Sequence, residues 1–151
     1  LLGKDNLVEI ICYCLMPNHF HFLLKQLKDG GISVFLSKIS NSYTKYFNVK
    51  YKRTGPLLEG KFKSVHVATD EYLVHLSRYI HLNPVVSNVS SLGNYDWSSY
   101  HEYMGNNNSI CNTSLVLGLF QSKSEYQKFL EDRISYGIDL EIIKHLLMDD
   151  E

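Results

Sequence analysis

The chain has 151 residues, of which 44% are hydrophobic and 21% charged, and this composition is typical of one soluble globular domain with or without a small extension. It has no run of 18 apolar residues and its first residues do not resemble a signal peptide, so we predict neither a membrane span nor a secreted protein. The three cysteines, Cys12, Cys14 and Cys111, exclude a disulfide framework and fit a reducing compartment, which predicts a cytoplasmic protein.

The net charge of -1 conceals an uneven distribution of charge along the chain. Residues 1–90 carry 11 Lys and Arg against 6 Asp and Glu, whereas residues 91–151 carry 4 against 10. Within the first part, residues 36–63 carry seven basic residues against Glu59 alone. Such a stretch attracts polyanions such as nucleic acid, although a solvated surface can have the same composition.

The first predicted element is a β-hairpin. Residues 7–15 are apolar and partly β-branched, which favours a buried strand, and residues 19–25 predict a second strand. Between them, Met16-Pro17-Asn18 favours a turn because proline and asparagine are common turn residues.

A helix follows the break at Gly30-Gly31. Ser33 is a plausible N-cap, and apolar residues recur at helical spacing to about residue 47. Residues 48–60 then predict a basic loop with two glycines and a proline, and residues 61–67 alternate in the manner of a strand.

A second long helix begins after Thr69 or Asp70, either of which can cap it, and it runs to about Leu82. Asn83-Pro84 is expected to end this helix, because the residue before proline is pushed out of the helical region. Beyond it the sequence predicts a loop and two short helices with an acidic surface, at residues 88–100, 113–121 and 124–147.

His19 and His21 form the first candidate site. Residues i and i+2 of a strand point to the same face, so both imidazoles project together while Phe20 and Phe22 point to the opposite face. Two imidazoles on one face can share a divalent ion. Taken alone, the pair can equally be two histidines that fall by chance on a solvated face.

Tyr79 and Asn83 form the second candidate site. They are four residues apart on one helix and therefore share a face. A tyrosine can act as a covalent nucleophile, although its pKa of about 10 requires help from a base or a cation at neutral pH. The carbonyl oxygen of an asparagine is a hard ligand that suits magnesium or manganese. The alternative is a core tyrosine followed by an Asn-Pro helix stop.

Several motifs together resemble the HUH tyrosine transposases, and in particular their REP-associated branch. Met16-Pro17-Asn18-His19-Phe20-His21 is similar to the His-hydrophobe-His signature of that family, and Arg78 to Val85 is similar to its tyrosine helix. Residues 55–64 and 95–100 also match that branch. The matches occur in the order of the family and cover roughly residues 7–105.

The resemblance implies an α+β, ferredoxin-like sandwich with an antiparallel sheet, in which family members have a further strand and helix before the region where this chain starts. It implies an N-terminally truncated catalytic domain over residues 1–104 and a small C-terminal helical extension over residues 105–151. His19 and His21 are then metal ligands, Asn83 is the third ligand and Tyr79 is the nucleophile.

The implied activity is metal-dependent cleavage and joining of single-stranded or hairpin DNA through a 5′-phosphotyrosine intermediate, with Mg²⁺ or Mn²⁺ as the divalent ion. One tyrosine suffices if strands are exchanged stepwise or between the two subunits of a homodimer. Two alternatives are a non-catalytic nucleic-acid-binding protein that retains the fold and a ferredoxin-like interaction module. The candidate DNA-binding residues are Lys50, Lys52, Arg53, Lys61, Lys63 and Arg78, and Tyr51 could stack on a base.

Overall fold

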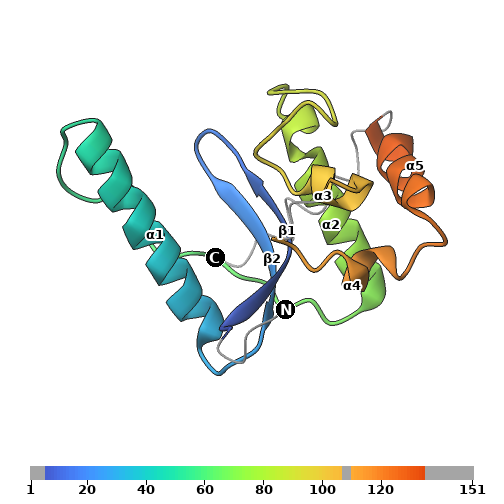
Figure 1. Ribbon diagram of the computed structural model, residues 1–151, viewed down its shortest axis with the longest axis horizontal. Helices are drawn as coiled ribbons and strands as arrows, with labels where there is room; N and C mark the ends of the chain where they lie inside the picture. The colour runs from blue at the N-terminus through green and yellow to red at the C-terminus, as the bar shows by residue number, and fades with distance from the viewer. Residues whose placement is uncertain (1–5, 107–109, 135–151) are drawn as a thin grey trace. The chain divides into compact units, whose positions relative to one another are not determined.

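A computed structural model describes residues 6–106 and 110–134. The described chain is an α+β fold with a two-stranded antiparallel sheet, which confirms the predicted class (Figure 1). Its elements, in chain order, are β1 (Val8–Leu15), β2 (Phe20–Gln26), α1 (Gly31–Lys50), α2 (Asp70–Val86), α3 (Tyr100–Met104), α4 (Ser114–Leu117) and α5 (Lys123–Ile134).

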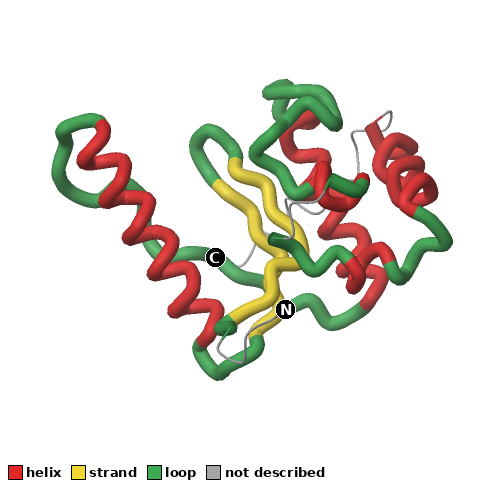
Figure 2. The backbone as a smooth tube through the Cα atoms, in the orientation of Figure 1, coloured by secondary structure: helices red, strands yellow, loops and turns green. Residues whose placement is uncertain are grey.

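The chain divides into two compact units, and the hairpin contributes to both. Of the described residues, the first unit contains 6–9 and 25–64, and the second contains 10–24, 65–106 and 110–134. Figure 2 shows the two strands of the hairpin joined by their turn. The predicted boundary between residues 104 and 105 stays a prediction, although α4 and α5 both pack against α2 within the second unit.

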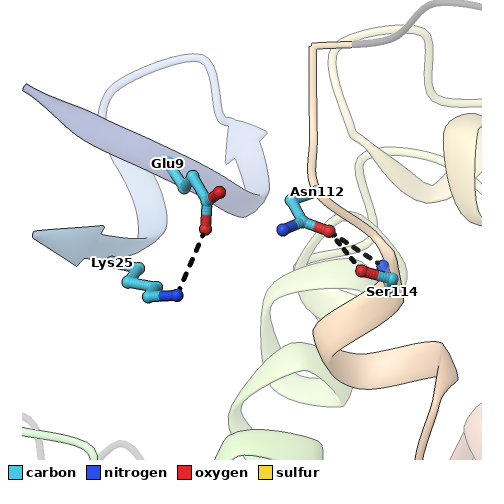
Figure 3. Close-up of polar contacts among 4 residues, drawn as sticks. All are labelled: Glu9, Lys25, Asn112 and Ser114. Carbon is cyan, nitrogen blue, oxygen red and sulfur yellow. Dashed lines mark hydrogen bonds and ion pairs between the residues drawn. The ribbon is translucent and has the colours of Figure 1, made fainter. Parts of the chain in front are cut away.

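In the first unit, the end of the hairpin and the start of α1 are held closely together. Leu27 N–H donates to the carbonyl oxygen of Leu7 at 3.0 Å. The buried carboxylate of Glu9 forms an ion pair with Lys25, whose Nζ lies 3.6 Å from Oε2 (Figure 3). Helix α1 begins at Gly31, two residues before the predicted cap, because Gly30 adopts a left-handed conformation with φ 67° and turns the chain into the helix.

Gly31 tolerates no side chain at this junction. A Cβ atom added there would clash with the carbonyl oxygen of Leu7, which is backbone and cannot swing aside. We expect Gly31→Ala to lower the free energy of unfolding by about 1–3 kcal/mol, the usual cost of overpacking. Denaturation in urea measures the effect, and Ser42→Ala on the exposed side of α1 is the control with little expected change. Equal stability of the two variants would show that the junction is loose.

The second unit is built around α2. Thr69 caps this helix, as predicted, because its Oγ1 accepts the N–H of Tyr72 at 3.1 Å. Helix α5 packs along α2, and both α3 and α4 contribute to the same unit (Figure 1). The fully buried side chains come from β1, α2, α3, α4 and α5, and they include Ile11, Cys12, Ile80, Leu82, Tyr103, Val116, Tyr126 and Leu130.

A segment predicted as loop pairs with the free edge of β1. Leu15 N–H donates to the carbonyl oxygen of Trp97 at 2.8 Å, and Cys14 forms an antiparallel bridge with Ser98. The hydroxyl of Tyr95 donates to the Leu15 carbonyl oxygen at 2.6 Å. The chain then enters α3, a short helix that the sequence pattern did not predict. The backbone of this segment and the Tyr95 side chain therefore attach it to the hairpin, whereas the Trp97 side chain is 65% exposed.

Four other predictions differ from the structure or lie partly outside it. Residues 61–67 form no strand, and α2 continues through the buried Pro84 to Val86 instead of ending before it. Helix α4 is shorter than predicted and begins where Asn112 Oδ1 accepts the N–H and hydroxyl of Ser114 (Figure 3). The predicted helix at 124–147 is confirmed as α5 to residue 134, and its remainder lies outside the described residues.

Candidate active site

The β1–β2 turn places two imidazole rings side by side. Met16 N–H donates to the carbonyl oxygen of His19 at 2.8 Å and closes the turn. His19 is exposed directly before β2, and His21 is partly buried within it. Their ring centroids are 4.9 Å apart, with an angle of 85° between the ring planes. The two rings are therefore close enough to bind the same small ligand.

Helix α2 brings Tyr79 and Asn83 to the same place. Both side chains are buried, and both contact His21. The Asn83 amide nitrogen lies 3.2 Å from His21 Nε2, and the Tyr79 ring centroid lies 5.3 Å from that of His21. The two candidate pairs, one from a strand and one from a helix, thus converge around His21 within the second unit.

The hydrogen bonds of the two imidazoles are satisfied by one tautomer of each ring. The carboxamide oxygen of Asn18 lies 2.6 Å from His19 Nδ1, and since this oxygen can only accept, Nδ1 donates. The Asn83 amide nitrogen can only donate, so His21 Nε2 accepts. In the neutral form, both rings therefore keep a lone pair on Nε2, which is the form a metal ligand needs. The sequence analysis assigned Asn18 to the turn and did not predict that its side chain orients the His19 ring. The position of Asn18 directly before His19 could have indicated this contact.

Burial sets the charge state of the site. It lowers the pKa of His21 to about 4, with a further decrease from the positive charge of a protonated His19. His21 is consequently neutral at pH 7. Burial also raises the pKa of Tyr79, an effect that a hydrogen bond with Asn83 partly offsets. The phenol is therefore protonated at neutral pH and needs a nearby base or cation to become a good nucleophile.

The side chains around His21 are of types that can coordinate a divalent ion. The 3.2 Å between His21 Nε2 and the Asn83 amide nitrogen is a hydrogen-bond distance, so an ion bound by both side chains would replace this contact. Rotation of the carboxamide would turn its oxygen toward such an ion. No group of three or more His, Cys, Asp or Glu side chains in residues 6–106 and 110–134 can hold a metal ion, so a third protein ligand at these histidines has to be of another type, such as Asn83.

Arg78, predicted to contact DNA, is buried in the packing between α2 and α5. Its guanidinium carbon lies 4.2 Å from the ring centroid of Phe129, and Nη2 donates to His75 Nδ1 at 2.7 Å. Burial lowers the pKa of Arg78 to about 10. His75 Nε2 in turn lies 4.0 Å from a carboxylate oxygen of Glu71. These contacts explain the position of the Arg78 side chain within the second unit. Its contact with DNA stays a prediction.

His81, the other histidine near the centre of α2, is a core residue. Its two nitrogens lie 2.8 Å from the hydroxyls of Tyr126 and Ser99. Burial lowers the pKa of His81 to about 3. A neutral imidazole satisfies both hydroxyls because one nitrogen donates and the other accepts. His81 therefore connects α2 to α5 and to the start of α3.

His81 should make the stability of the protein depend on pH. Its pKa is about 3 in the folded state and about 6.5 in an unfolded chain, so stability is retained above pH 6.5 and lost as the pH falls below it. We expect a loss of up to about 1.4 kcal/mol per pH unit from this group. Urea denaturation between pH 7 and 4.5 tests this by giving the slope of the unfolding free energy against pH. His81→Gln should reduce this slope by the amount that corresponds to uptake of one proton on unfolding, whereas His66→Gln, at an exposed position, should leave the slope unchanged. An identical slope in His81→Gln would contradict the assignment.

The other five predicted DNA-binding residues all belong to the first unit, namely Lys50, Lys52, Arg53, Lys61 and Lys63. Lys61 and Lys63 are exposed. Lys50 Nζ lies 5.6 Å and 5.5 Å from the ring centroids of Tyr46 and Tyr51, and both rings are more than half exposed. Basic and aromatic groups thus share one surface at the end of α1, and the DNA contacts of these residues stay a prediction.

Comparison with known proteins gives one match. A family model described as "Transposase IS200 like" matches residues 2–83, which is more than half of the chain. The matched range contains both histidines, Tyr79 and Asn83. The chain matches no curated protein and no solved structure. No helix in the described part of the chain is long and apolar enough to cross a membrane.

Proposed function

Since this chain belongs to the family of IS200-like transposases, we propose that it cleaves and rejoins single-stranded DNA with Tyr79 as the nucleophile. Membership of the family makes it a DNA-cleaving and DNA-joining enzyme. The finer proposal is supported by one observation above all. The buried Tyr79 ring lies 5.3 Å from His21, whose Nε2 faces Asn83 at 3.2 Å. The proposed nucleophile and the proposed metal ligands are therefore adjacent.

His19, His21 and Asn83 would hold the divalent ion, Mg²⁺ or Mn²⁺. When bound, such an ion neutralises charge that develops on the phosphate oxygens during the reaction. His21 is suited to this role because its low pKa keeps the imidazole neutral far below pH 7. Asn83 also forms a hydrogen bond with Tyr79, so the ligand set and the nucleophile are held by one helix.

The reaction is a direct displacement at phosphorus. The Tyr79 hydroxyl oxygen forms a bond to phosphorus, the bond from phosphorus to the 3′ oxygen breaks, and the phenolic proton ends on that oxygen. The products are a 5′-phosphotyrosine and a strand with a free 3′ hydroxyl. No phosphoester bond is lost in total, so a 3′ hydroxyl can later attack the phosphotyrosine and rejoin DNA.

We also propose that the chain belongs to the REP-associated branch and acts on hairpin DNA. The segments 55–64, 78–85 and 95–100 support this, since each resembles that branch in sequence. A homodimer in which two subunits exchange strands is compatible with the single Tyr79. The basic residues of the first unit would contact the DNA backbone, and they include Lys50, Lys52, Arg53, Lys61 and Lys63.

The position of a radioactive label tests the proposed chemistry. Because the protein keeps the fragment that begins with the 5′ phosphate, a 3′-labelled oligonucleotide should label the protein and a 5′-labelled one should not. The adduct should form with Mg²⁺ or Mn²⁺, survive denaturing electrophoresis and be absent in EDTA. Mass spectrometry should place it on the peptide with Tyr79. Binding of DNA without any adduct would instead indicate a non-catalytic binding protein.

A further inference from the structure

We propose that a cavity at the C-terminal end of α1 binds one unpaired nucleotide of the DNA strand and recognises an edge of its base. The cavity has a volume of about 550 Å³, is widely open to solvent and lies wholly within the first unit. This volume is large enough for a small ligand, one side of which would stay exposed to solvent. The inference depends on the proposed function only in taking the ligand to be single-stranded DNA.

The charge of the cavity suits a nucleotide. Its lining includes Lys45, Lys52 and Arg53 and no acidic side chain. Val49, which is 74% exposed, adds an apolar surface against which the plane of a base can lie. The rest of the lining consists of amide and hydroxyl side chains of α1 and of the following loop, together with Gly55. Cations for a phosphate thus lie beside hydrogen-bonding groups for a base.

Two polar atoms of residues in this lining have no hydrogen-bond partner within the described chain. They are the carboxamide oxygen of Asn48, an acceptor, and Nη1 of Arg53, a donor, and both atoms are buried. The other ends of the same side chains fold the loop, because Asn48 Nδ2 donates to the Gly55 carbonyl oxygen at 2.9 Å and Arg53 Nη2 donates to that of Pro56 at 3.1 Å. Leaving buried polar groups unpaired is unfavourable, so a ligand that pairs both would be stabilised.

A phosphate cannot satisfy both atoms, since its oxygens only accept hydrogen bonds from Arg53 and offer nothing to the Asn48 oxygen. The Watson–Crick edge of a base carries both an acceptor and a donor, so it offers a partner of the right kind for each atom. That edge is free only in an unpaired nucleotide. Because the two atoms are covered in the free protein, the loop has to shift slightly on binding. Lys52, with its strained φ of 51°, lies at the centre of that loop.

A comparison of oligonucleotides with and without bases tests the proposal. We would measure binding in EDTA, where cleavage cannot occur, by fluorescence anisotropy with a dA 20-mer, an abasic 20-mer carrying the same phosphates, and a 20-base-pair duplex. Wild type should prefer the dA 20-mer over the abasic strand by about tenfold, since pairing and stacking of one base supply that much. Equal affinity for the two strands would overturn the proposal without use of any variant.

Variants separate recognition of the base from attraction of the phosphates. Arg53→Lys keeps the positive charge but loses the planar guanidinium with its fixed N–H donors. The tenfold preference for the dA 20-mer over the abasic strand should therefore fall to about twofold, with little change in the salt dependence of binding. Lys45→Ala should weaken binding of both strands equally and lower the salt dependence. Lys38→Ala, which makes the same charge change on α1 outside the cavity, is its matched control. An unchanged preference in Arg53→Lys would refute recognition of a base.

These outcomes are distinct from those of the proposed cleavage. A protein that prefers the dA 20-mer in EDTA but forms no adduct with Mn²⁺ would contradict only the cleavage by Tyr79. A protein that forms the adduct but binds the dA and abasic strands equally would contradict only the nucleotide site. A thermal midpoint of Arg53→Lys close to that of wild type shows that the variant is folded.

Discussion

Tyr79→Phe is expected to form no covalent adduct with single-stranded DNA and to lower the rate of cleavage by at least about 10⁴-fold, as removal of a nucleophile does in other enzymes. The phenylalanine ring keeps the packing of Tyr79 against His21, where the ring centroids are 5.3 Å apart. Only the hydroxyl and its hydrogen bond with Asn83 are lost. Binding of the same oligonucleotide should therefore stay within about twofold of wild type, since the loss of one hydrogen bond costs only about 1 kcal/mol of stability.

Tyr72→Phe is the matched control because it removes a tyrosine hydroxyl from the same helix. This variant should form the adduct at the rate of wild type. The experiment compares the three proteins by denaturing electrophoresis with a 3′-labelled strand. If Tyr79→Phe still became labelled, another side chain would be the nucleophile, and the convergence of Tyr79 on His21 would have only a structural meaning.

His21→Ala is expected to abolish the response of the protein to Mn²⁺. In wild type, Mn²⁺ should raise the thermal midpoint, because an ion that binds only the folded state stabilises it. Loss of the Nε2 that lies 3.2 Å from the Asn83 amide removes a ligand near the centre of the proposed site. We expect cleavage to fall by more than about 100-fold, since even partners that only orient metal ligands contribute 10- to 100-fold.

His66→Ala is the control for His21→Ala, because it removes an exposed imidazole of the same unit. Asn83→Asp is expected to strengthen the binding of Mn²⁺, whereas His21→Ala is expected to weaken it. A carboxylate at this position adds a negative oxygen ligand and should tighten binding of Mn²⁺, as titration calorimetry can measure. An undiminished Mn²⁺ response in His21→Ala would show that the ion binds elsewhere.

The local geometry of the site was predictable from sequence, but its assembly was not. Spacing alone places His19 with His21 and Tyr79 with Asn83, because the period of a strand is two residues and that of a helix is close to four. Nothing in either spacing brings α2 against β2. That approach was implied by the resemblance of the motifs, and the 3.2 Å between Asn83 and His21 is a fact of tertiary structure.

The predictions that were wrong relied on local preferences that packing overrides. Pro84 was expected to end α2, yet it is buried within the helix, and the helix continues for two more residues. Residues 61–67 alternate like a strand but form none, because alternation alone supplies no partner strand. Conversely, Trp97 and Ser98 lie in a stretch that was predicted to be a loop, and their backbone pairs with the free edge of β1. Strand pairing is non-local and leaves little trace in a short window of sequence.

Each strand of the hairpin has one part in the first unit and one part in the second unit, and this has a consequence for engineering. The chain leaves the second unit after residue 24 and returns to it at residue 65, and the first unit closes on itself where Lys25 pairs with Glu9 on the neighbouring strand. Residues 25–64 complete this unit only together with residues 6–9, and the segments on either side of residues 25–64 supply His19, His21, Tyr79 and Asn83. A unit taken from a related transposase therefore has to replace residues 6–9 as well as residues 25–64. Such an exchange should change which DNA strand is bound, while the residues proposed for cleavage stay unchanged.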